Sequence, residues 1–67
     1  MNELSTKLKA RRKERKITQA NLASLSGVSL NVIKKLESGN SKVSLENITK
    51  VLKIFGLVLS VEEAKNL

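Results

Sequence analysis

The stretch Ile17–Gly39, ITQANLASLSGVSLNVIKKLESG, decides how this chain folds. Two short helical patterns lie on either side of Gly27, the only glycine in the first half of the chain. Thr18 is a good N-cap for the first helix, which offers Leu22 and Ala23 to a core. Gly27 stands at the C′ position, where glycine tolerates a left-handed backbone. The stretch therefore predicts two helices joined by a tight turn.

The second helix of this pair has an unusual outward face. Ser29 is its expected N-cap, and Ile33 and Leu36 hold the helix against the core. The side chains left to point outward are Leu30, Asn31, Val32, Lys34 and Lys35. Asn can make a bidentate contact to adenine, Lys can reach guanine or phosphate, and Leu or Val can touch a thymine methyl. The pair therefore indicates a helix-turn-helix whose second helix enters the DNA major groove.

The remaining sequence predicts two more helices and one strand. We expect helices over residues 2–15, 19–25, 30–37 and 45–55. The last is capped by Ser44 and carries an inward stripe of Leu45, Ile48, Val51, Leu52 and Phe55. After Gly56 the alternating sequence LVLSV predicts a strand formed by Leu57, Val58, Leu59, Ser60 and Val61. A single strand lacks a partner within a helical chain, so we expect it to pair with its copy across a two-fold axis.

The expected architecture is all-α. Four to five helices form a DNA-binding domain over residues 1–56, and residues 57–67 form a dimerisation strand and tail. With 67 residues the chain makes one small domain, which buries only about 60% of its unfolded surface as a monomer.

Charge and composition narrow the partners. Thirteen Lys and Arg against six Asp and Glu give a net charge of +7, which favours an anionic partner such as nucleic acid. Seven of the basic residues lie among the first sixteen, although lysines of small proteins also serve solubility. The lone Phe argues against RNA, which is recognised through stacking aromatics, and against a membrane-surface helix.

The absent residue types exclude other functions. There is no Cys or His, so disulfides and the usual zinc or haem ligands are missing, and we expect no metal and no cofactor. Acid–base and nucleophilic chemistry also lack their usual carriers, which excludes an enzyme. No signal peptide or membrane-spanning segment is visible, and we expect a cytoplasmic protein.

A family pattern runs through the two central helices. It consists of Thr18, Gln19, Leu22, Ala23, Ser26, Gly27, Val28, Ser29, Ile33, Leu36, Glu37 and Gly39. This pattern resembles the Cro/phage-repressor-type helix-turn-helix, or XRE family, over residues 4–56. The resemblance implies a lambda-repressor-like fold, two-fold dimers and palindromic double-stranded operators. The chain departs from the family at Val43, where proline is common, and at Leu30, where a polar residue is common.

The same resemblance assigns roles to single residues. It implies that Gln19 opens its helix against a phosphate, and that Leu30, Asn31 and Lys35 face the bases. It also implies a buried ion pair between Arg12 and Glu37. The full set of candidate DNA-binding residues is Gln19, Ser29, Leu30, Asn31, Val32, Lys34, Lys35, Asn40 and Lys42. On the residues alone, the alternative is that Arg12, Glu37 and the lysines are solvated surface charges.

The tail carries a second resemblance. The sequence GLVLSVEEAKNL, residues 56–67, is similar to the end of HipB-type antitoxins. This similarity implies a strand that pairs across the dimer, repression of the protein's own operon and a HipA-type kinase toxin as partner. The alternative is a free-standing phage-like repressor that has no toxin.

Overall fold

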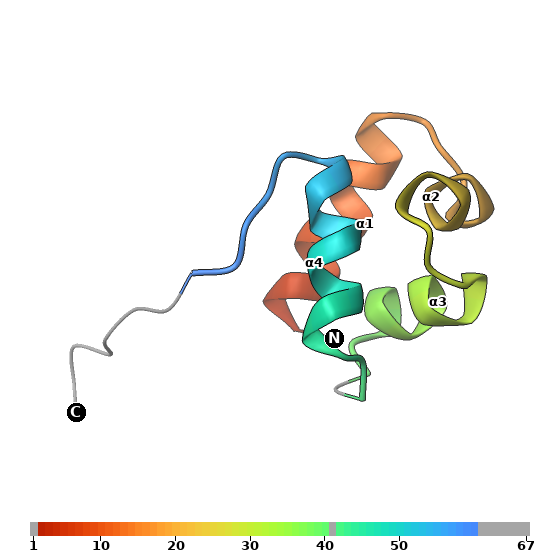
Figure 1. Cartoon of the computed structure of the whole chain (residues 1–67). Helices are drawn as coiled ribbons and strands as arrows, with labels where there is room; N and C mark the ends of the chain where they lie inside the picture. Colours follow the sequence, from red (N-terminus) through yellow and green to blue (C-terminus); the bar gives the residue numbers. More distant parts are fainter. Residues whose placement is uncertain (1, 41, 61–67) are drawn as a thin grey trace, which may run out of the picture.

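Four helices make up the part of the chain that the structure describes. The computed structural model describes residues 2–40 and 42–60, and in this part it contains no strand. The helices are α1 (Glu3–Glu14), α2 (Gln19–Ser26), α3 (Leu30–Ser38) and α4 (Leu45–Ile54). Their order and approximate bounds agree with those expected from the sequence. After α4 the chain runs away from the helical body, on the side opposite α3 in Figure 1.

Each helix begins at a side chain that accepts a backbone hydrogen bond. Thr18, Ser29 and Ser44 cap α2, α3 and α4 in this way, which confirms the three predicted caps. Asn2 caps α1 rather than beginning it. Its Oδ1 accepts from the Ser5 N–H at 2.8 Å, and the Ser5 Oγ lies 3.0 Å from the Asn2 N–H, so the two residues form a reciprocal capping box.

Each helix also ends at a residue with a left-handed backbone. These residues are Lys16 after α1 (φ 55°), Gly27 after α2 (φ 77°), Gly39 after α3 (φ 83°) and Gly56 after α4 (φ 66°). Glycine adopts this conformation without steric cost, whereas a side chain crowds the following carbonyl. Glycine therefore serves at three of the four ends, and the lysine at the fourth stands out.

The core lies where α2 packs against α3 and α4, and where α1 packs against α3. Its buried apolar residues are Leu8, Leu22, Ala23, Val28, Ile33, Leu36, Val51, Leu52 and Phe55. Leu22, Ala23, Ile33 and Leu36 are among them, as the sequence predicts. The core is small, and it places α3 at the surface with one face buried and the other open.

The stripe on α4 is shorter than predicted. Leu45 is 66% exposed, so the prediction that it faces the core is wrong. Ile48 is half-buried, and full burial begins only at Val51. The first turn of α4 is therefore more exposed than its second half.

Residues 57–60, the described part of the segment after α4, have no regular structure. The Leu57 N–H donates to the Leu52 carbonyl at 3.0 Å, and the Leu57 side chain packs against the core. Leu59 is 48% exposed and Val58 is 87% exposed, an order that follows the predicted alternation. A strand here needs a second chain, so the pairing of residues 57–61 stays a prediction. Val61 and the rest of the tail lie outside the described residues.

Candidate nucleic-acid interface

The outer face of α3 is open to solvent and carries four of the nine predicted DNA-binding residues. Leu30, Asn31, Lys34 and Lys35 are exposed, while Ile33 and Leu36 fix the opposite face in the core. Ser29 is occupied as the helix cap, because its Oγ accepts from the Val32 N–H at 3.2 Å. The exposed set combines one amide, two ammonium groups and one apolar side chain, which are groups that can contact base edges and phosphates.

Val32 differs from its neighbours on this face. Its side chain is half-buried and packs against the core, so the prediction that it points outward is wrong in part. Val32 stands four residues before Leu36 and therefore lies on the same side of the helix as that buried residue. It marks the edge of the open face rather than its centre.

A bidentate ion pair holds α3 against α1. Arg12 Nε donates to Glu37 Oε2 at 2.6 Å, and Arg12 Nη2 donates to Glu37 Oε1 at 2.9 Å. The Glu37 side chain is 3% exposed and that of Arg12 is 12% exposed. The pKa of the Arg12 guanidinium is raised by the hydrogen bond and the charge of Glu37, against the opposing effect of burial. Arg12 therefore stays charged wherever the protein is folded.

The same ion pair reaches α2. The third guanidinium nitrogen, Arg12 Nη1, donates to the Ile17 carbonyl at 2.9 Å, and Gln19 Nε2 donates to Glu37 Oε1 at 3.3 Å. The Gln19 side chain is half-buried in consequence. Its amide is thus already engaged with α3, whereas the sequence predicts contact with a phosphate. The position of the amide at the start of α2 still leaves it next to the open face.

A shallow hollow adjoins this network. It encloses about 490 Å³ and is lined by Arg12, Lys16, Ile17, Thr18, Gln19, Ala20, Leu30 and Lys34. The lining therefore joins the end of α1, the start of α2 and two exposed residues of α3. It includes three cationic side chains and no carboxylate, so the hollow favours an anion.

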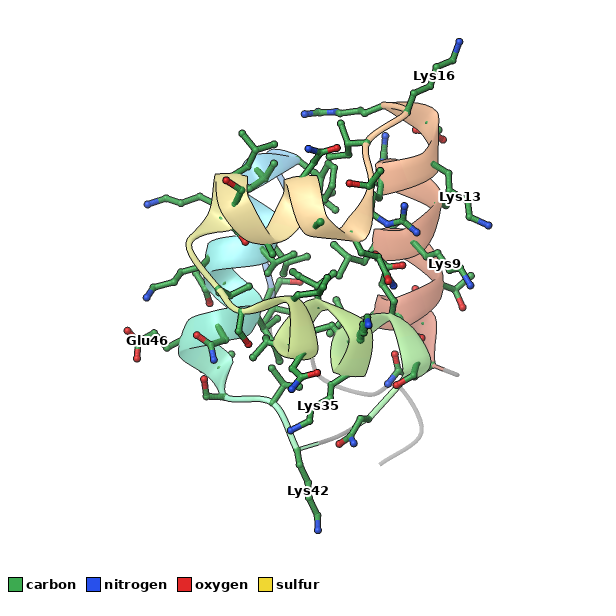
Figure 2. All side chains as sticks on the ribbon, turned by 90° about the vertical axis from the view of Figure 1, so that its right-hand side faces the viewer. Lys9, Lys13, Lys16, Lys35, Lys42 and Glu46 are labelled. Atoms are coloured by element: carbon green, nitrogen blue, oxygen red, sulfur yellow. The ribbon has the colours of Figure 1, made fainter. Side chains whose placement is uncertain are left out.

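The connection between α3 and α4 provides two further predicted residues. Asn40 Oδ1 accepts from the Lys42 N–H at 2.7 Å, which shapes the connection around the exposed Lys42 side chain. In Figure 2, Lys42 projects from the lower end of the molecule and Lys16 from the upper end. Cationic groups thus lie at both ends of the surface formed by α2 and α3. The predicted dimerisation residues 57–60 line a separate hollow, which shares no residue with the first.

Several contacts of this region were not predicted. They include the Gln19–Glu37 hydrogen bond and the Arg15 guanidinium, which lies 5.1 Å from the centre of the Phe55 ring and donates to the Ile54 carbonyl at 3.0 Å. This Arg15 contact ties the end of α1 to the end of α4. Two features of the sequence hinted that side chains of α1 do more than keep the chain soluble. They are the uneven charge of the first sixteen residues and the family resemblance, which implies the Arg12–Glu37 pair.

Most of the chain matches a known family of proteins. The family model described as helix-turn-helix matches residues 8–60, which span α2, the Gly27 turn and α3. The chain belongs to this family. The XRE-type helix-turn-helix is a DNA-binding regulator domain, so the protein is a DNA-binding transcriptional regulator. A search of curated proteins found no match for the chain.

Three further observations concern other functions. The family is one of regulators and not typically of enzymes. Within residues 2–40 and 42–60, no cluster of carboxylates could hold a metal ion. None of the four described helices combines the length and the apolar character needed to cross a membrane.

The ion pair predicts an asymmetric response to mutation. Arg12→Ala leaves a carboxylate buried with only Gln19 as partner, so we expect it to cost roughly 3–5 kcal/mol of stability. Glu37→Ala should cost less, because Arg12 lies nearer to solvent and can be rehydrated. Thermal and urea unfolding followed by circular dichroism measure both losses. The control is Glu46→Ala, which removes an exposed pair with Lys50 at 3.5 Å and should change stability by less than about 1 kcal/mol.

Equal losses for Arg12→Ala, Glu37→Ala and Glu46→Ala would contradict a buried pair.

Proposed function

We propose that the protein is a transcriptional repressor that binds a palindromic double-stranded operator as a homodimer. The observation that carries this proposal is the outer face of α3, where Leu30, Asn31, Lys34 and Lys35 are exposed on a helix that is braced from behind. Arg12, Gln19 and Glu37 form that brace. A braced helix can hold its side chains at fixed positions against base edges, which specific readout requires.

The roles on this face follow from chemistry. The Asn31 amide can donate to and accept from one adenine, whereas Lys35 can reach guanine acceptors. Leu30 can contact a thymine methyl, which suits its place at the first residue of α3. Lys42, in the connection before α4, is positioned for phosphate and carries no sequence information. The α3 face therefore supplies the specificity, and the connection supplies general affinity.

Residues 57–60 support the homodimer. They leave the helical body with Val58 and Leu59 exposed, and none of their described backbone groups beyond Leu57 forms a backbone hydrogen bond within residues 2–40 and 42–60. Between them and α1 lies a hollow of about 680 Å³ that includes Leu4, Leu8 and Leu52. Antiparallel pairing with a second chain would satisfy the backbone and cover Val58 and Leu59. The dimer sets two α3 helices about one turn of DNA apart.

A toxin partner extends the proposal. The similarity of residues 56–67 to HipB-type antitoxins supports a role as the antitoxin and autorepressor of a HipA/HipB-type pair. The competing function is a free-standing phage-like repressor, which uses the same α3 face and the same dimer. Only the existence of a kinase partner separates the two.

Base reading is tested by substitution on a selected site. A bound sequence is first isolated from random duplex DNA. Asn31→Ala and Lys35→Ala should then each lose about 1–3 kcal/mol on that site and relax the preference at one base pair. Lys42→Ala is the matched control, because loss of a phosphate contact weakens selected and scrambled duplexes alike. Equal losses on both duplexes for Asn31→Ala would remove it from the base-reading residues.

The dimer is tested by ending the chain after Gly56. This change removes the pairing segment and should leave α1–α4 largely helical but less stable. The buried core precedes the cut, whereas Leu57, which packs against that core and donates to the Leu52 carbonyl, is lost. The truncated chain should sediment as a monomer, and operator binding should fall toward weak, non-specific affinity because one half-site offers few contacts. Sedimentation and circular dichroism give the first two readouts, and binding to full and half operators gives the third. A truncated chain that stays dimeric at micromolar concentration would assign the dimer to another surface.

The toxin role predicts a ternary complex. The product of a kinase gene adjacent to this one should bind the dimer and leave α3 free for operator DNA. Size-exclusion chromatography with light scattering measures the mass with and without operator. A kinase that binds only in the absence of operator, or that does not bind at all, would favour the free-standing repressor.

A further inference from the structure

Three lysines lie along α1 and the turn that follows it. In Figure 2, Lys9 and Lys13 project from the right-hand edge of the molecule and Lys16 from its upper end. Within the described residues none of them forms a salt bridge, since Glu14 pairs with Arg11, Glu37 with Arg12 and Glu46 with Lys50. Their charge is therefore not balanced by a near carboxylate of the described chain.

The backbone at Lys16 is the strongest sign that its side chain has a function. Helices α1, α3 and α4 end in the same two-bond motif, in which a left-handed residue and its successor both donate to the last turn. After α1 these bonds are Lys16 N–H to the Lys13 carbonyl (3.0 Å) and Ile17 N–H to the Arg12 carbonyl (3.3 Å). Gly39 and Gly56 occupy the equivalent left-handed position after α3 and α4.

The three helix ends differ in the residue at the left-handed position, which carries a side chain only after α1. The motif is the same at all three helix ends, and two of them use the residue that suits it best. At the third, Lys16 holds φ at 55°, where a side chain is strained against the next carbonyl. Glycine would therefore fit this backbone conformation with less strain. Strain that persists where a simple substitution would remove it points to a use for the group that causes it.

The position of Lys16 indicates that use. It lines the hollow beside α3 together with Leu30 and Lys34, two residues of the proposed reading face. The third cation of the hollow, Arg12, is already neutralised by Glu37. Lys16 and Lys34 thus carry the unbalanced charge there, and Lys13 and Lys9 continue it along α1. Glu46, by contrast, projects from the opposite edge of the molecule in Figure 2.

We propose that Lys16, continued by Lys13 and Lys9, binds the sugar–phosphate backbone of DNA beside the groove that α3 enters. This contact is separate from base reading and rests on the proposed function as a DNA-binding repressor. An ammonium group on a flexible stem suits a phosphate, which needs a charge at short range rather than a fixed fork. These three lysines lengthen the stretch of DNA that the protein contacts beyond the base pairs that α3 reads. They contribute affinity without sequence preference.

The most informative variant is Lys16→Gly, because it should raise the stability of the protein and weaken its binding to DNA. Removing the strained side chain should raise the Tm by a few degrees. Removing the charge should weaken binding roughly five- to tenfold at about 0.1 M salt, to the same extent on a selected operator and on a scrambled duplex. The slope of log K against log salt should decrease by about 0.9 for the one lost phosphate contact. Lys13→Gln should weaken binding in the same way without the gain in Tm.

Lys53→Gln is the matched control, since it removes one exposed charge from α4 and lines neither hollow. It should change the salt slope and the affinity much less than Lys16→Gly does. Binding by Lys16→Gly that equals that of Lys53→Gln on both duplexes would overturn the proposal, and so would a loss confined to the selected operator. If the wild-type protein binds neither duplex, the proposed function fails, and this inference fails with it.

Discussion

The Arg12–Glu37 pair is the interaction on which the position of α3 depends. One guanidinium uses three nitrogens to join α1 to the Glu37 carboxylate of α3 and to the Ile17 carbonyl before α2, and Gln19 adds a fourth bond. Three helices are thereby fixed through a single buried carboxylate. Apolar packing alone tolerates small shifts of one helix along another, whereas a bidentate pair permits only one geometry. In a chain with so small a core, this pair sets the tilt of α3.

The helix ends impose a second constraint, which acts on the turns. All four helices stop at a left-handed residue, so the chain reverses within a few residues and the helices can be short. Glycine adopts this conformation without steric strain after α2, α3 and α4, whereas the lysine after α1 is strained. The strained residue, Lys16, is exposed and lines the same hollow as Leu30 and Lys34.

Much of the fold could be predicted from short-range features of the sequence. The caps Thr18, Ser29 and Ser44 and the glycine turn at Gly27 each act through neighbouring backbone groups, so they can be recognised from the residue and its spacing alone. Leu45 and Val32 went wrong because burial depends on which other element covers a helix face, and periodicity does not contain that information. The bond between Gln19 and Glu37 joins two helices, and the strain at Lys16 depends on a backbone angle. Neither is visible in composition or spacing.

The exposed segment after α4 couples stability to association. A domain of this size is marginally stable by itself, and it leaves Val58 and Leu59 in solvent. Burying these side chains against a second chain would stabilise only the folded state, so stability would rise with protein concentration. Two half-sites on one operator would favour the same dimer, because each recognition helix binds weakly alone. Folding, dimerisation and DNA binding would then be linked equilibria, and occupancy of the operator would rise more steeply than the concentration of the protein.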